Sequence, residues 1–271
     1  MNCATANAST RRLRRARGFS LIELMIAMVL TGFVVLAVVA IYGSTRENYV
    51  NQDEVARLQE NVRIGMGLVE RTVRQGNYKR IPAARDQNPM LLAAFSFSPL
   101  LGIDGGSTTL GDSDTLQITY NGSSKFPADP SDPADGAIVD CTGATVAADQ
   151  NRASRFAIRV VSGRPWLSCQ RTGFDNTWVD LIPDVEAMEI EYGVYADETR
   201  TVASFTSWSA AIDPARVVAL RLSLLFRSAA EVAPATSATT YPLAERTYGP
   251  FNDRFLRTQV ESTIVVRSTA M

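Results

Sequence analysis

The sequence contains no histidine and only two lysines, Lys79 and Lys125. Histidine is the side chain used most often as a general base and as a metal ligand, so its absence removes the commonest route to either kind of site. The sequence also has no GxxxxGK[ST] phosphate loop, no HExxH zinc motif and no GxSxG nucleophile elbow. We therefore expect a protein that is not an enzyme, with no catalytic residues, no metal and no cofactor.

An excess of positive charge is missing too. The formal net charge is −1, from 27 basic and 28 acidic residues. Five arginines and no acidic residue lie within residues 11–17, so residues 19–271 carry 22 basic and 28 acidic residues, a net charge of −6. A basic surface for DNA or RNA is therefore not expected.

What the sequence does have is one long apolar run. Residues 19–42 form a stretch of 24 residues with a single full charge, Glu23. At ~1.5 Å per residue, a helix of this length reaches ~36 Å, enough to cross a hydrocarbon core of ~30 Å. The arginines before the run place its N-terminal side in the cytoplasm. We expect a single inner-membrane span, with the rest of the chain outside this membrane.

Two features separate this run from an ordinary signal or anchor. A carboxylate close to the start of an apolar span is costly and usually has a partner. A secretory signal has a core of about 7–15 apolar residues followed by a small-residue cleavage site. Here the run is longer, and the small residue, Gly18, stands before it.

The segment Gly18-Phe19-Ser20-Leu21-Ile22-Glu23, after its basic leader, resembles the class III signal of type IV pilins and pseudopilins. The resemblance implies that a prepilin peptidase cleaves between Gly18 and Phe19 and methylates the new amine of Phe19. It also implies that Glu23 pairs with the amine of a neighbouring subunit, since a desolvated carboxylate and ammonium must neutralise each other. A plain single-pass anchor is the alternative.

Three cysteines are present. Cys3 lies in the leader and would leave with it, so Cys141 and Cys169 remain as a pair. In an oxidising periplasm we expect them to form a disulfide, and two free buried thiols are the alternative.

We expect the helix to continue to about residue 78, with residues 19–42 in the membrane and an amphipathic second half. Gly76 followed by Asn77 predicts its end. The second half carries apolar residues at spacings of three and four, the pattern of one helix face. These residues are Val55, Leu58, Val62, Met66, Val69 and Val73.

The remainder of the chain predicts an antiparallel β-rich domain. Residues 79–111 indicate an irregular connection with one short helix at about 90–97, and Ser162-Gly163 indicates a hairpin turn. Alternating runs predict strands at residues 114–120, 155–161, 164–169, 178–182, 185–196, 217–228 and 257–267, with loops at 126–136 and 229–253. The expected fold is α+β and type IV pilin-like, a long helix packed on an antiparallel sheet. Its parts are a leader (1–18), a helix (19–78) and a globular domain (79–271).

Several segments of this domain resemble the PilW-type minor pilins, relatives of the J pseudopilin of type II secretion. They are 112–120 (DSDTLQITY), 167–170 (LSCQ), 181–188 (LIPDVEAM), 217–228, 253–255 (DRF) and 260–267. The resemblance implies a low-abundance subunit that joins other minor pilins and the major pilin, primes assembly at the pilus tip, presents a tip adhesin there, and supports twitching motility or adhesion. The alternatives are a minor pseudopilin of type II secretion and a membrane-tethered binding module.

Two acidic loops and three tryptophans are weaker candidates for binding sites. The acidic loops do not match the spacing of a calcium-binding EF-hand, so solvated turns are favoured. The tryptophans offer a surface for a sugar or a peptide, but packing is the favoured role. The residues are Asp104, Asp112 and Asp114; Asp129, Asp132 and Asp135; and Trp166, Trp178 and Trp208.

Overall fold

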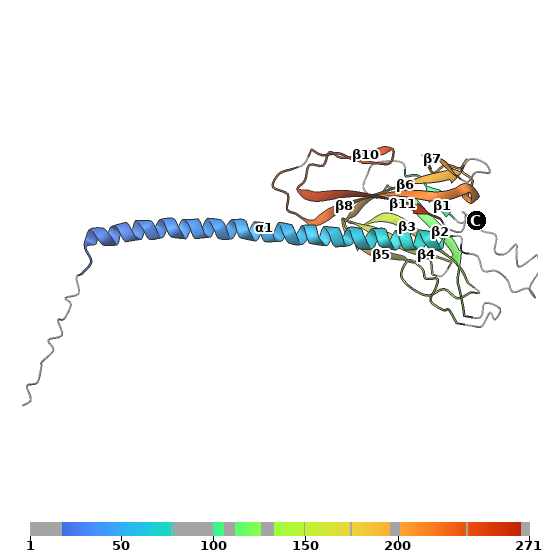
Figure 1. Ribbon diagram of the computed structural model, residues 1–271, viewed down its shortest axis with the longest axis horizontal. Helices are drawn as coiled ribbons and strands as arrows, with labels where there is room; N and C mark the ends of the chain where they lie inside the picture. Colours follow the sequence, from blue (N-terminus) through green and yellow to red (C-terminus); the bar gives the residue numbers. More distant parts are fainter. Residues whose placement is uncertain are drawn as a thin grey trace, which may run out of the picture. The chain divides into compact units, whose positions relative to one another are not determined.

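The structure is a computed structural model, and it describes residues 18–76, 78, 100–105, 112–125, 133–148, 150–173, 175–195, 201–236 and 238–266. One long helix, α1 (Leu21–Gln75), is followed by strands (Figure 1). The chain divides into two compact units, Met1–Val50 and Asn51–Met271.

The strands run antiparallel in three sheets. A five-stranded sheet has the order β1-β2-β3-β4-β5, a four-stranded sheet has the order β11-β8-β6-β7, and β10 pairs with β9. The strands are β1 (Leu100–Ile103), β2 (Thr115–Asn121), β3 (Asn151–Val161), β4 (Arg164–Thr172), β5 (Trp178–Pro183), β6 (Val185–Tyr195), β7 (Val202–Ser207), β8 (Val217–Glu231), β9 (Tyr241–Leu243), β10 (Arg246–Tyr248) and β11 (Phe255–Val265). The expected α+β class is confirmed, but there are two large sheets where the alternation had suggested one.

The part of α1 that lies in the second unit packs one face on these sheets. Leu58, Met66, Val69 and Val73 are buried and share one hydrophobic core with residues of both large sheets. The predicted stripe is wrong at its first position, because Val55 is 39% exposed. Its neighbour Glu54 is buried instead, since it has a hydrogen-bonding role described below.

Strands β6 and β8 are covered on both faces. Their residues Met188, Ile190, Leu220 and Leu222 belong to the core under α1. On the opposite face, a second cluster joins Ala187 and Leu225 to Leu243 and Tyr248, with the last two supplied by the β9–β10 hairpin. A strand that is buried on both faces does not need to alternate apolar and polar residues. This explains why the sequence of β8 is a nearly continuous apolar run.

A disulfide closes the loop before β3. Cys141 and Cys169 are bonded, with their Cα atoms 6.4 Å apart. Both residues are buried, and the segment around Cys141 contributes Ile138 and Val146 to the core under α1. The bond therefore holds this segment against strand β4.

Most strand predictions are confirmed within a few residues of their ends. The predicted hairpin turn joins β3 to β4, with Ser162 and Gly163 both at positive φ (51° and 77°), the conformation that a two-residue type I′ turn requires. Four short elements were missed: β1, β7 and the β9–β10 pair. Each has three to six residues, too few to display a period. The short helix expected at 90–97 lies outside the described residues.

Two glycines of α1 allow a test of how closely the helix packs on strand β8. A Cβ at Gly65 would lie 3.2 Å from Cζ of Phe226, whereas a Cβ at Gly67 would meet nothing within 4 Å. We expect Gly65→Leu to lower the free energy of unfolding by about 1–3 kcal/mol through overpacking. Gly67→Leu should raise it by roughly 0.5–1 kcal/mol, because leucine favours a helix more than glycine does.

Denaturant unfolding of the two purified variants in detergent, followed by circular dichroism, measures both changes. Equal effects at the two positions would contradict the close approach of α1 to strand β8.

Candidate functional site

The first candidate site is the start of the described chain. Gly18 to Ser20 precede the helix, and α1 begins at Leu21. The carboxylate of Glu23 accepts a hydrogen bond from the backbone N–H of Ser20 (3.1 Å). This bond satisfies one of the free N–H groups at the helix start, where a negative charge is also favoured by the helix dipole. Glu23 and Phe19 are both solvent-exposed in the single chain.

The helix that follows is long and apolar enough to cross a membrane, and its most apolar 18-residue window has no buried residue. Side chains such as Phe33 (66% exposed) and Leu36 (68%) have no protein contact that would remove them from water. Exposing so many large apolar side chains in water is unfavourable by about 1.5–3 kcal/mol for each one. This part of α1 therefore requires a lipid or protein environment supplied from outside the chain.

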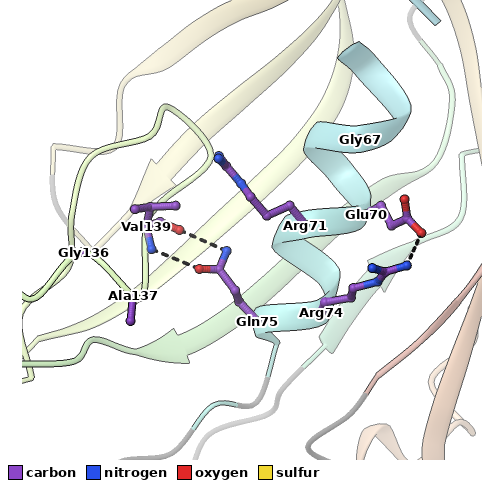
Figure 2. A pocket seen from close by; sticks show the side chains of 8 residues that line it. All are labelled: Gly67, Glu70, Arg71, Arg74, Gln75, Gly136, Ala137 and Val139. Atoms are coloured by element: carbon purple, nitrogen blue, oxygen red, sulfur yellow. Dashed lines mark hydrogen bonds and ion pairs between the residues drawn. The ribbon is translucent and has the colours of Figure 1, made fainter. Parts of the chain in front are cut away.

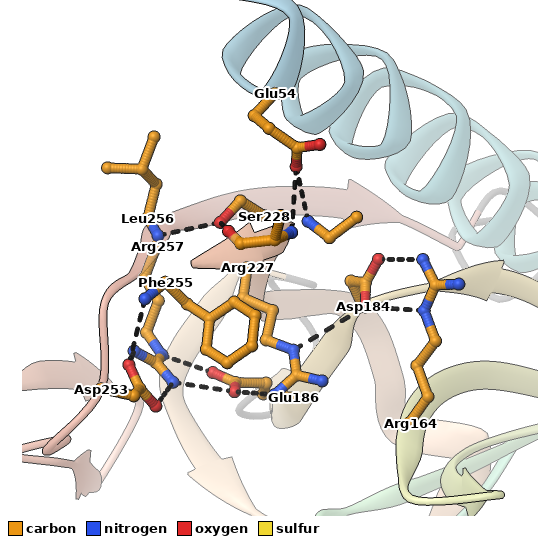
Figure 3. A network of polar contacts seen from close by, with 12 residues as sticks. Glu54, Arg164, Asp184, Glu186, Arg227, Ser228, Asp253, Phe255, Leu256 and Arg257 are labelled. Carbon is orange, nitrogen blue, oxygen red and sulfur yellow. Dashed lines mark hydrogen bonds and ion pairs between the residues drawn. The ribbon is translucent and has the colours of Figure 1, made fainter. Parts of the chain in front are cut away.

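The second candidate site is a polar contact between α1 and the end of strand β8. Oε2 of Glu54 accepts hydrogen bonds from the backbone N–H groups of Ala229 (2.8 Å) and Ala230 (3.2 Å). Next to them, the Ser228 hydroxyl accepts from the N–H of Leu256 in β11 (3.0 Å). Figure 3 shows Glu54 reaching from the helix to this strand end. The contact fixes one point of α1 on the four-stranded sheet.

Asp184 marks the corner at which the chain passes from one large sheet to the other. Strand β5 ends at Pro183 and β6 begins at Val185. Between them Asp184 takes a positive φ of 62°, and its backbone N–H donates to the carbonyl of Pro165 (2.8 Å). Its carboxylate accepts from Nε of Arg164 (2.9 Å), so both sheets are tied to this one residue.

A chain of ion pairs continues from this corner into the four-stranded sheet. The Arg257 guanidinium, with its side chain only 2% exposed, contacts Glu186 on one side (2.6 Å) and Asp253 on the other (2.6 Å). Arg227 contacts Glu186 (3.4 Å) and Asp184 (3.7 Å). Figure 3 shows these side chains as one network.

Three arginines and three carboxylates balance in this network, and aromatic rings cover it. Cζ of Arg257 lies 3.7 Å from the ring centroid of Phe251, and Cζ of Arg227 lies 4.3 Å from that of Phe255. Hydrogen bonds from the Arg257 guanidinium lower the pKa of Asp253. Because removing one member of a buried pair leaves a charge without its partner, the network fixes how these elements meet.

A second buried polar cluster lies under the β9–β10 hairpin. The Tyr248 hydroxyl donates to Glu189, and the Arg246 guanidinium contacts Asp104, Asp114 (3.7 Å) and Glu189 (3.4 Å). Burial raises the pKa of Asp114 to about 6 and that of Glu189 to about 7, because the ionised forms lose water. Three carboxylates therefore contact one guanidinium, and two of them, Asp114 and Glu189, are buried.

Asp114 has a structural role in place of the calcium ligation considered above. Its Oδ1 accepts from the N–H of Gly105 (2.9 Å) and its Oδ2 from the N–H of Ile190 (2.8 Å). In the described part of the chain, no group of three or more His, Cys, Asp or Glu side chains has an arrangement that could hold a metal ion. Asp129 and Asp132 lie outside it.

The tryptophan at the core, Trp208, has different surroundings from Trp166 and Trp178. Trp208 packs edge-on against Tyr192 at the core, with ring centroids 4.9 Å apart. Trp166 lies under the guanidinium of Arg164 and Trp178 under that of Arg159. Cation–π contacts of this kind stabilise the strands that carry them.

Comparison with known proteins indicates which family these features resemble. Residues 13–39 match the family model of the prokaryotic N-terminal methylation motif, and residues 155–268 match that of the type IV pilus-assembly protein W. Together the two matches support a PilW-type minor pilin. A type IV-like pilin from Thermus thermophilus is also similar in structure, with 14% identity, a TM-score of 0.48, and coverage of 79% of this chain and 98% of that one. No match is found among curated proteins.

The match to the type IV pilus-assembly protein W family supports a structural role for this pilin in pilus assembly. The first match covers the apolar run with Gly18, Phe19 and Glu23, and the second covers most of the polar network. The segments quoted in the sequence analysis therefore meet in space: Asp184 and Glu186 come from LIPDVEAM, Asp253 from DRF, and Arg227 from strand β8.

Glu54, in contrast, was missed by the sequence analysis. It lies one position from the apolar stripe of α1, so periodicity assigns it to the helix surface. Its partners, the N–H groups of Ala229 and Ala230, are 175 and 176 residues away along the chain. The available signal is weak: a carboxylate adjacent to the predicted buried face.

The buried acids under the hairpin predict an unusual pH dependence. The pKa values of Asp114 and Glu189 lie above their unfolded values (3.8 and 4.5), so their contribution to stability is complete below those values and is lost as pH rises through about 6–7. We expect the free energy of unfolding to fall by roughly 2–4 kcal/mol between pH 5 and pH 8. Denaturant titrations of the detergent-solubilised pilin at several pH values measure this change.

Glu189→Gln is the matched control, because glutamine has nearly the same shape and does not ionise. It should reduce the slope of stability against pH. Asp253 acts in the opposite sense, but only below its ordinary pKa of 3.8. A stability that rises from pH 5 to pH 8 would contradict this account of the cluster.

Proposed function

We propose that this pilin helps to initiate type IV pilus assembly, is located at or near the pilus tip, and supports twitching motility or adhesion. In this proposal a prepilin peptidase removes residues 1–18 and methylates Phe19. The apolar part of α1 first anchors the subunit in the inner membrane, with residues 79–271 in the periplasm. It then leaves the bilayer to pack among other minor pilins and the major pilin.

The observation that carries this proposal is the absence of protein contacts along the apolar part of α1. Its side chains are exposed from Leu21 to Tyr42, so the single chain does not bury them. A filament in which such helices pack together removes the same side chains from water. Glu23, one turn into the run, then requires a positive partner once it is desolvated, and the methylated amine of Phe19 in an adjacent subunit would supply it.

Two other functions make different predictions about the same segment. A minor pseudopilin of type II secretion would be processed in the same way but would be located in the secretion pseudopilus. A membrane-tethered binding module would keep its leader and remain in the membrane. The match to the type IV pilus-assembly protein W family favours the pilus subunit over both.

Intact-mass analysis of the protein recovered from membranes and from sheared surface filaments tests the proposal. We expect the mass of residues 19–271 plus one methyl group and minus two hydrogens, in both fractions. This mass reports cleavage after Gly18, methylation of Phe19 and the Cys141–Cys169 disulfide together. An uncleaved chain found only in membranes would reject the proposal and leave the tethered binding module.

Replacement of Glu23 tests the pairing within the filament. Glu23→Val should leave membrane insertion intact, because it makes the run more apolar. It should lower recovery in sheared filaments about tenfold or more, since the amine of the neighbouring subunit would be desolvated without a partner, at a cost of about 3–5 kcal/mol.

Thr31→Val, an uncharged change in the same run, is the matched control and should be incorporated normally. Immunoblots of membrane and filament fractions measure both variants. Normal incorporation of Glu23→Val would exclude the pairing.

A further inference from the structure

A groove lies between the last turns of α1 and the loop that precedes Cys141. Its volume is about 530 Å³, and it is lined from α1 by Gly67, Glu70, Arg71, Arg74 and Gln75, and from the loop by Gly136, Ala137 and Val139. All of these residues belong to the second unit. Figure 2 shows the Arg71 side chain extending from the helix toward the loop.

The walls of this groove are held in place by one side chain. The amide of Gln75 donates to the carbonyl of Val139 (3.3 Å) and accepts from its N–H (3.0 Å), so both amide atoms are used. The loop is also tied to the core through Ile138 and the disulfide of Cys141. A groove with fixed walls binds a partner at a lower cost in conformational entropy than one formed by mobile segments.

Arg71 differs from the other arginines of α1 in the second unit. Arg57 pairs with Asp53, Arg63 with Glu60, and Arg74 with Glu70. Arg71 has no ion pair with any residue that the structure describes.

The sequence explains the difference. The positions three and four residues from Arg71 on either side are Gly67, Leu68, Arg74 and Gln75, and none of them is acidic, so no helix pair can form.

Asp140, the acidic residue that follows Val139 in the loop, is committed elsewhere. Oδ1 of Asp140 accepts hydrogen bonds from the N–H of Thr142 (2.8 Å), the hydroxyl of Thr142 (2.7 Å) and the N–H of Ala144 (3.0 Å). These bonds close the turn at residues 140–144. The groove therefore presents a guanidinium whose charge is not neutralised from within the described chain.

We propose that this groove binds an acidic side chain of a neighbouring pilin subunit, with Arg71 as its ion-pair partner. The inference rests on the proposed function, since it requires a filament or tip complex. Charge complementarity supports a protein partner of this kind: residues 19–271 carry a net charge of −6, so a second chain of similar composition offers carboxylates in excess. A planar guanidinium also matches the two oxygens of a carboxylate in a bidentate contact.

Charge reversal in the native host tests the proposal with the full-length chain. Arg71→Glu should reduce recovery in sheared filaments roughly fivefold or more, while Arg71→Lys should retain most of it. Arg63→Glu is the matched control, because Arg63 is an exposed arginine on the same helix that pairs only with Glu60. The membrane fraction shows whether each variant is made and folded to the same level.

A photo-crosslinking amino acid at Ala137 identifies the occupant. We expect crosslinks to another pilin within a few residues of an Asp or Glu, and these should be lost in the Arg71→Glu background. Reversing that acidic residue to Arg should restore filament recovery of Arg71→Glu. If Arg71→Glu and Arg63→Glu are incorporated equally, or if the crosslinked segment has no acidic residue, the proposal falls.

The two proposals fail separately. An unprocessed wild-type chain that is absent from filaments would overturn the pilus function itself. A processed wild-type chain that enters filaments, together with an unaffected Arg71→Glu variant, would overturn only the role of the groove.

Discussion

Burial of one face of α1 between Leu58 and Val73 is the contact on which the globular unit depends. Both large sheets turn their apolar side chains to this face, and neither sheet has another apolar layer of comparable size among the described residues. The close approach at Gly65 and the buried Glu54 adapt the helix to strand β8. Hydrophobic burial supplies the driving force, while the polar contacts fix the helix at defined points.

The same helix has two different surroundings along its length. In the second unit its apolar residues are covered by the chain's own sheets, and in the first unit they are exposed. A subunit of this kind remains incomplete alone, because its most apolar part has no partner within the chain. This part of the helix therefore requires apolar surroundings from outside the chain, which a lipid bilayer or other pilins can supply.

The polar network joins short segments that are scattered through the C-terminal half of the chain. Three arginines (Arg164, Arg227, Arg257) and three carboxylates (Asp184, Glu186, Asp253) are spread over more than ninety residues of sequence, yet they form one balanced set of charges. Each member is needed because a buried charge without its partner is strongly destabilising. The network thus serves the fold.

The sequence by itself determined the features that depend on neighbours within one element: the apolar run with Glu23, the helix face, most long strands and the Ser162-Gly163 turn. The periodicity of apolar side chains is a local property, so it can be recognised in the sequence without knowledge of the fold. Only the tertiary structure decided that Glu54 is buried while Val55 is exposed, that there are two large sheets, and that the acids of distant motifs share arginines. It also placed Arg71 in a groove without an ion pair to any residue that the structure describes. These outcomes depend on contacts between residues far apart along the chain, such as the 175 positions between Glu54 and Ala229, which no local pattern encodes.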